Sequence, residues 1–119
     1  MLQHVSLETH PDQVGPALAF WSVLGFEPVG APEPIADFVT WVERGGTQIH
    51  LLHTPTPTTP QLGHPAVVVD DFAATLGTLR EAGFEVEEAQ ELWGAPRAFA
   101  IMPGGHRVEV MATAPPTAS

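Results

Sequence analysis

The chain has 119 residues, a formal net charge of −10 and no cysteine. This length suits one folding unit with its own core. The excess of acidic side chains argues against a nucleic-acid partner, whose affinity comes largely from basic groups. The lack of cysteine excludes disulfides and thiolate metal sites. No apolar run is long enough to span a membrane and no secretory signal is visible at the start, so we expect a cytoplasmic protein without a membrane partner.

Residues 1–53 are predicted to form one module with the order strand, helix, strand, strand, strand. After a strand over residues 2–9, Pro11 and Asp12 start a helix, and Val14, Ala17, Leu18, Trp21 and Leu24 make its apolar stripe. Gly25 stands where a glycine commonly ends a helix. Short strands are then expected at residues 27–29, 35–42 and 48–52.

Residues 54–63, TPTPTTPQLG, form a linker rich in proline and threonine. A second module of the same order is predicted over residues 64–112. It begins with a strand at 64–69, continues with a helix from Asp70 and Asp71 to Gly83, and ends with strands at 85–87, 97–102 and 107–111. Residues 113–119, TAPPTAS, are expected to be a disordered tail.

The second module repeats the first. LGFEPV is echoed by AGFEVE at an offset of 58 residues, and GGTQIHL is echoed by GGHRVEV at an offset of 59. His4 and His64 are 60 residues apart in similar strands. Three pairs in the same order and at nearly the same offset indicate a duplicated unit.

Four ionisable residues share one face of the predicted strands. Side chains alternate across a strand, so the apolar neighbours of each residue must pack on the opposite face, against the helices. The four are His4, His50, His64 and Glu109, two from each module at equivalent positions. The remaining histidines, His10, His53 and His106, do not share this pattern and are interpreted as surface residues.

Three imidazoles and one carboxylate suit a divalent first-row metal such as zinc, nickel, manganese or iron. We therefore expect His4, His50, His64 and Glu109 to bind a metal ion if the sheet curves, with Glu109 also a candidate general base. If His50 lies too far away, the other three form the two-histidine, one-carboxylate set of non-haem Fe(II) oxygenases. The candidates to line a substrate pocket are Ser6, Trp41, Trp93, Arg97 and Phe99.

The chain resembles the vicinal oxygen chelate superfamily, which includes glyoxalase I, extradiol dioxygenases and bleomycin-resistance proteins. The matching pieces, LQHVSLE, AFWSVLGFE, RGGTQIHLL, LGHPAVVVDDF, LREAGFEV, WGAPRAF and PGGHRVEVM, span almost the whole chain. The resemblance implies an α+β fold of two βαβββ modules that form a U-shaped mixed sheet with helices on its outer face. It places the ligand positions on the same four residues and implies a homodimer whose sites are shared between chains.

Two functions follow from this resemblance. The first is a metal-dependent isomerase, lyase or dioxygenase that acts on a small oxygen-chelating substrate. The second is a binding protein without catalysis, similar to the bleomycin-resistance group. Bacterial glyoxalase I usually has glutamate where His50 stands, which argues against glyoxalase activity itself. A serine hydrolase is disfavoured because the chain has no GxSxG motif.

Overall fold

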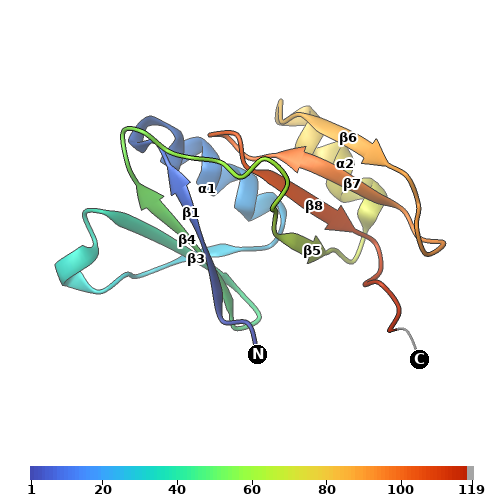
Figure 1. Ribbon diagram of the computed structural model, residues 1–119, viewed down its shortest axis with the longest axis horizontal. Helices are drawn as coiled ribbons and strands as arrows, with labels where there is room; N and C mark the ends of the chain where they lie inside the picture. The colour runs from blue at the N-terminus through green and yellow to red at the C-terminus, as the bar shows by residue number, and fades with distance from the viewer. Residues whose placement is uncertain (118–119) are drawn as a thin grey trace.

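The computed structural model describes residues 1–117 and contains the predicted β-α-β-β-β order twice (Figure 1). The first module consists of β1 (His4–Thr9), α1 (Val14–Val23), β2 (Glu27–Val29), β3 (Val39–Arg44) and β4 (Thr47–His53). The second consists of β5 (Ala66–Val68), α2 (Phe72–Glu81), β6 (Val86–Ala89), β7 (Arg97–Ile101) and β8 (Arg107–Met111). Two short 3-10 turns, η1 (Pro11–Gln13) and η2 (Glu33–Ile35), lie in the first module.

Each module forms its own four-stranded mixed sheet, ordered β1-β4-β3-β2 and β5-β8-β7-β6. In both sheets the first and last strands are parallel and the other pairs antiparallel. The registers correspond as well: Ser6 lies opposite His50 in one sheet, and Ala66 lies opposite Glu109 in the other. The predicted α+β fold of two equivalent modules is therefore confirmed.

The helices begin and end where local chemistry favours it. The Asp71 side chain caps α2 by accepting a hydrogen bond from the Ala74 backbone N–H at 3.0 Å. Gly25 and Gly83 follow the two helices with φ of 89° and 88°, a left-handed conformation that glycine adopts without a steric penalty. Pro16 is tolerated because it stands in the first turn of α1, where backbone N–H groups have no intrahelical partner.

The two modules share one hydrophobic core on the helix-covered faces of the sheets. Val42 and Leu51 of the first module and Val108 and Val110 of the second are fully buried in it. Trp21 of α1 reaches across to the second module, where its indole Nε1–H donates to Met102 Sδ at 3.1 Å. The modules are therefore joined by packing as well as by the linker.

Several predicted boundaries shift. The strand expected at 35–42 runs from Val39 to Arg44, because η2 occupies Glu33–Ile35, a stretch that contains Pro34. The strand expected at 64–69 is confined to Ala66–Val68, since Pro65 has no N–H to contribute to a strand ladder.

The interpretation of His106 as a surface residue is wrong. Its side chain is 4% exposed, and its Nε2 lies 2.8 Å from the Glu8 carbonyl oxygen, which makes it a contact between the modules. His10 accepts a hydrogen bond from the Asp12 backbone N–H, and His53 bonds the Thr40 hydroxyl.

Residues 54–63 contain no helix or strand, yet they contact β1 through the Thr58 N–H, which donates to Glu8 Oε1 at 3.0 Å. Of the tail predicted to be disordered, 113–119, residues 118 and 119 lie outside the described residues. Thr113, the first residue of that tail, accepts a hydrogen bond from Trp93 Nε1 at 3.1 Å. Within residues 1–117, neither helix has the length and apolar character needed to cross a membrane.

Candidate functional site

The face of each sheet opposite the core, here called the inner face, carries the predicted site residues. In β1 the burial alternates as expected, with Leu7 and Thr9 buried while His4 and Ser6 are exposed. Deeper in each sheet, the inner-face residues His50 and Glu109 are only 7% and 8% exposed. An imidazole and a carboxylate buried at equivalent positions need polar partners there, because burial of an unpaired polar group is costly.

In the first module the rings of His4, His50 and Trp41 form a stack. The His4 and His50 rings lie 4.0 Å apart at an angle of 15°, and the Trp41 and His50 rings lie 4.0 Å apart at 6°. Strand pairing explains the stack, because Trp41 of β3 is directly opposite His50 of β4. We call His4 and His50 the first half-site.

The His50 imidazole is held by one further neighbour besides the stacked rings. Its Nε2 lies 2.7 Å from Gln48 Oε1, so this nitrogen can donate to the amide oxygen. Burial lowers the pKa of His50 below its ordinary value, and the neighbouring His4 imidazole lowers it further. His50 is therefore neutral at pH 7, the state in which an imidazole binds a metal. Beside it, the Trp41 indole Nε1 is buried and has no hydrogen-bond partner among the described residues.

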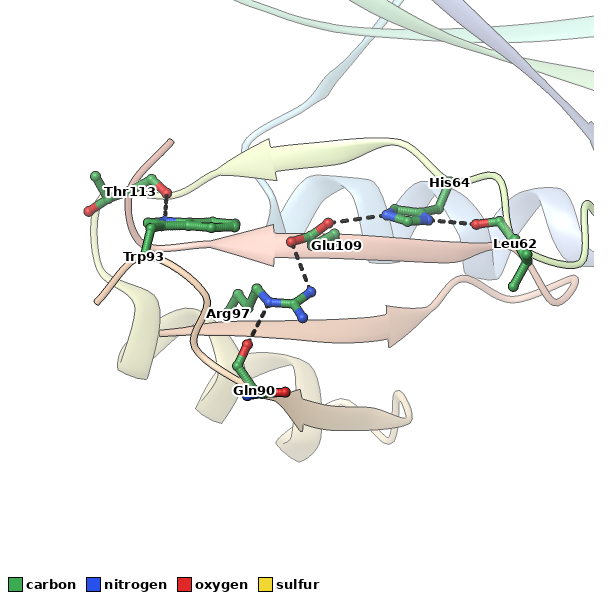
Figure 2. Close-up of polar contacts among 7 residues, drawn as sticks. All are labelled: Leu62, His64, Gln90, Trp93, Arg97, Glu109 and Thr113. Atoms are coloured by element: carbon green, nitrogen blue, oxygen red, sulfur yellow. Dashed lines mark hydrogen bonds and ion pairs between the residues drawn. The ribbon is translucent and has the colours of Figure 1, made fainter. Parts of the chain in front are cut away.

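In the second module His64 and Glu109 form the second half-site, shown in Figure 2. His64 Nε2 lies 3.1 Å from Glu109 Oε1, and its Nδ1 lies 2.8 Å from the Leu62 carbonyl oxygen. A carbonyl oxygen only accepts, so Nδ1 carries the proton. In neutral His64 the lone pair of Nε2 then faces the carboxylate oxygen, an arrangement that a cation between the two atoms would stabilise.

Arg97 holds the other side of the Glu109 carboxylate. Its Nη1 lies 3.3 Å from Glu109 Oε2, and its Nε–H donates to the Gln90 carbonyl oxygen at 2.7 Å (Figure 2). The guanidinium carbon is 6.0 Å from the centre of the Trp93 ring and 5.7 Å from that of Phe99. Three of the predicted pocket residues, Trp93, Arg97 and Phe99, thus gather around Glu109.

Ser6 lies apart from this group. It is exposed on β1 and lines a cavity of about 310 Å³ at the junction of the modules, together with His64, His106, Pro60 and Pro65. Residues of β1 and His64 of the second half-site line the same cavity, so the first strand of module one lies close to the second half-site.

The predicted metal ligands therefore form two pairs, and one chain does not gather them into a single set. Among residues 1–117, no group of three or more histidine, cysteine, aspartate or glutamate side chains is placed to hold a metal ion. The chemistry of the donors still fits a divalent ion, since both pairs offer nitrogen or carboxylate oxygen. The Leu62 carbonyl also orients His64 in the way that metal-binding histidines are commonly oriented.

One inner-face residue, Arg107, shares the predicted face of Glu109 but was not among the predicted site residues. The Arg107 guanidinium lies over the Phe99 ring, 4.1 Å from its centre. The signal was present in the strand alternation, because Arg107 is two residues from Glu109 and must share its face.

The sequence matches no protein-family model and no curated protein. Solved structures do match. A protein from Bacillus anthracis named as a member of the glyoxalase family is 24% identical, with 93% of each chain covered and a TM-score of 0.83. This chain has the vicinal oxygen chelate fold. The oxidase ChaP-H2 is 27% identical over 96% of this chain and 94% of its own, with a TM-score of 0.74. A lactoylglutathione lyase from Agrobacterium tumefaciens is 19% identical over 93% and 92%, with a TM-score of 0.70.

The resemblance seen in the sequence is thus confirmed at the level of the fold. In the vicinal oxygen chelate fold the two sheets present equivalent inner faces, and here each inner face carries one half-site. An oxidase and a lyase of this fold both match the chain, so the fold by itself does not select a reaction.

Proposed function

We propose that this protein is a divalent-metal-dependent enzyme that acts on a small oxygen-chelating substrate, as an isomerase, lyase or dioxygenase. The observation that supports this most strongly is the orientation of His64, whose Nδ1 is tied to the Leu62 carbonyl while Nε2 faces Glu109 Oε1 at 3.1 Å. A fixed tautomer beside a buried carboxylate is what a metal-binding pair requires. It is less suited to a pocket that only binds a large antibiotic.

The metal site is completed between two copies of the chain in this proposal. His4 and His50 of one copy meet His64 and Glu109 of a second copy, since each chain alone provides two separate pairs. His4 lies on β1 and His64 just precedes β5, and each of these strands is at the end of its sheet, with one edge unpaired by any strand among the described residues. The neighbouring side chains of Leu2 and Leu62 are 66% and 75% exposed, which favours their burial against a partner.

A bound divalent ion would supply Lewis-acid stabilisation of negative charge on a substrate oxygen. Zinc, nickel, manganese and iron all fit a site of imidazole and carboxylate. The residues of the chain provide the remaining functions. Glu109 accepts a proton from the substrate, while Arg97 keeps its carboxylate in place through Oε2. Neutral His50 contributes a nitrogen donor that Trp41 and His4 hold by stacking.

The first test is the metal content of protein purified without a histidine tag. We expect close to one divalent ion per chain in the wild type and its loss in His64→Ala. His10→Ala is the matched control, because His10 lies in the turn after β1 and should leave the metal in place. Wild-type protein without metal that binds a bleomycin-like cation tightly would contradict the enzyme and favour a binding protein.

The second test addresses the shared site. His4→Ala and His64→Ala should each lose metal, and mixing them by unfolding and refolding should restore about one ion per mixed dimer. The reason is that such a dimer contains one site with both substitutions and one site with neither. A site built within each chain would not be restored by mixing. A monomeric mass in solution with metal still bound would also contradict the shared site.

A further inference from the structure

The distribution of positive charge on the chain is uneven. The chain has four Lys and Arg residues in all, and each of the four is an arginine. Arg80 pairs with Glu88 at 3.5 Å, and Arg44 donates to the Leu24 carbonyl at 3.3 Å. The other two, Arg97 and Arg107, lie on the inner face of the second sheet and contact the same ring, that of Phe99.

These two arginines differ from the other two because they lie over an aromatic ring and still have free N–H groups. Among residues 1–117, Arg107 makes no ion pair and no side-chain hydrogen bond, and Arg97 uses Nε and Nη1 but not Nη2. In Figure 2 no dashed line joins the second terminal nitrogen of Arg97 to any of the residues drawn. Stacking on an aromatic ring fixes the plane of a guanidinium and leaves its N–H groups directed sideways. Such groups are suited to a carboxylate or another anionic oxygen.

A cavity of about 280 Å³ lies beside Arg107 and has Phe99, Ile101 and Arg107 in its lining, while Arg97 contacts the same Phe99 ring from outside the lining. Glu85 and Glu87 also line it, but both are exposed, so water screens their charges. The Glu88 carboxylate is already paired with Arg80. The Arg97 side chain is only 14% exposed and is paired with Glu109 through Nη1, so its free Nη2 would interact with a ligand under weaker screening by water.

We infer that the substrate carries an anionic oxygen, such as a carboxylate, which Arg97 and Arg107 bind while a planar part of the molecule lies against Phe99. This inference rests on the proposed function, because it places the anionic group beside Glu109, the proposed metal ligand. It narrows the substrate class to small anions with a flat, unsaturated or aromatic portion. The two arginines thereby determine specificity within a protein whose overall charge is strongly negative.

The test uses three probes of one shape and different charge: benzoate, benzamide and benzamidine. Binding to the full chain is measured by calorimetry, as purified and again after EDTA, so that any contribution of a bound metal is separated. We expect benzoate to bind about tenfold or more tightly than the other two in both states, since a charge-assisted hydrogen bond is worth at least this factor. Benzamidine binding as tightly as benzoate would overturn the inference, because the glutamates would then dominate the cavity.

Substitutions of single arginines test which of them bind benzoate. Arg107→Gln and Arg97→Gln should each weaken benzoate binding about tenfold, while Arg44→Gln on β3 of the first module should leave it unchanged. Arg107→Gln is the decisive variant, since within residues 1–117 Arg107 makes no ion pair or side-chain hydrogen bond whose loss would disturb the fold. Unchanged benzoate binding in Arg107→Gln would contradict the inference. Metal content of the same samples separates the two proposals. Bound metal without charge selectivity would contradict only the inference about the substrate. Charge selectivity without bound metal would contradict only the proposal of a metal-dependent enzyme.

Discussion

The two half-sites occupy equivalent places in the duplicated fold but are built differently. The first is an imidazole pair stacked on a tryptophan, with no charge of its own when both rings are neutral. The second pairs an imidazole with a carboxylate that an arginine also holds. In the first half-site stacking holds the imidazole rings in position, whereas in the second the negative carboxylate attracts a cation. The comparison shows that equivalent strand register puts both half-sites at the same place in their sheets. The neighbouring side chains then decide which chemistry each half-site can perform.

The largest difference between the half-sites should appear in metal affinity. We expect Glu109→Gln to weaken binding by more than about 100-fold, because it removes the negative charge that offsets the ion, which exceeds the usual loss for a supporting residue. His50→Gln should cost about tenfold, since a neutral donor is replaced by a weaker neutral one. Competition with a calibrated chelator measures both. Equal losses would show that the half-sites contribute alike.

An effect no larger than that of His50→Gln is expected from the residue that supports His50. Gln48→Leu removes the amide oxygen 2.7 Å from His50 Nε2 and leaves the ring free to change tautomer. Loss of such an orienting partner typically weakens a metal site by about tenfold. The same chelator competition measures this change. Gln13→Leu is the control, because Gln13 lies in η1 and its side chain contacts neither half-site through a hydrogen bond. Unchanged affinity in Gln48→Leu would mean that this contact does not orient His50 for the metal.

The stack itself should contribute to stability. Trp41→Leu keeps an apolar side chain but removes the ring that lies 4.0 Å from His50. We expect a loss of about 1 kcal/mol in the free energy of unfolding, typical of an aromatic pair. For a domain of this size that corresponds to a fall in Tm of about 4 °C. Thermal unfolding of the EDTA-treated protein measures it. A change in metal affinity at unaltered Tm would instead indicate that Trp41 acts only through the ligand site.

The smallest effect concerns pH. Burial, and then the nearby His4 imidazole, lower the pKa of His50 in the folded protein, so the unfolded chain binds the proton more readily. The stabilisation from neutral His50 is complete above the unfolded value of about 6.5 and is lost as the pH falls below it. Metal-free wild type should therefore lose Tm between pH 7 and 5 slightly more than His50→Gln does. If Tm falls equally with pH in the two proteins, the lowered pKa of His50 does not contribute to stability.

Much of the fold could be predicted because the duplication repeats the same signals. GGTQIHL and GGHRVEV place His50 and Glu109 at one register, and the strand pairing confirms that equivalence. The glycines after both helices were predicted for the same reason, since their positive φ is a local property. Strand ends were less predictable near Pro34 and Pro65, where a local turn competes with sheet pairing.

The arrangement of the site was harder to predict because it depends on contacts between distant segments. Parity places His4 and His64 on inner faces but does not say how far apart the two sheets lie. His106 was misjudged since its partner, the Glu8 carbonyl, is 98 residues away. The stacking of Trp41 on His50 and of Arg107 on Phe99 follows from strand pairing, which alternation within a single strand cannot supply.

The indole of Trp21 resting on the sulfur of Met102 has a consequence for how the duplicated gene can change. A fragment that ended in the linker would present Trp21 to water, and its counterpart would do the same with Met102. Either half, expressed alone, would therefore expose apolar surface to water and be prone to aggregate. The two modules depend on each other for burial of these side chains. Insertions and deletions should therefore be tolerated in exposed loops and disfavoured next to Trp21 and Met102.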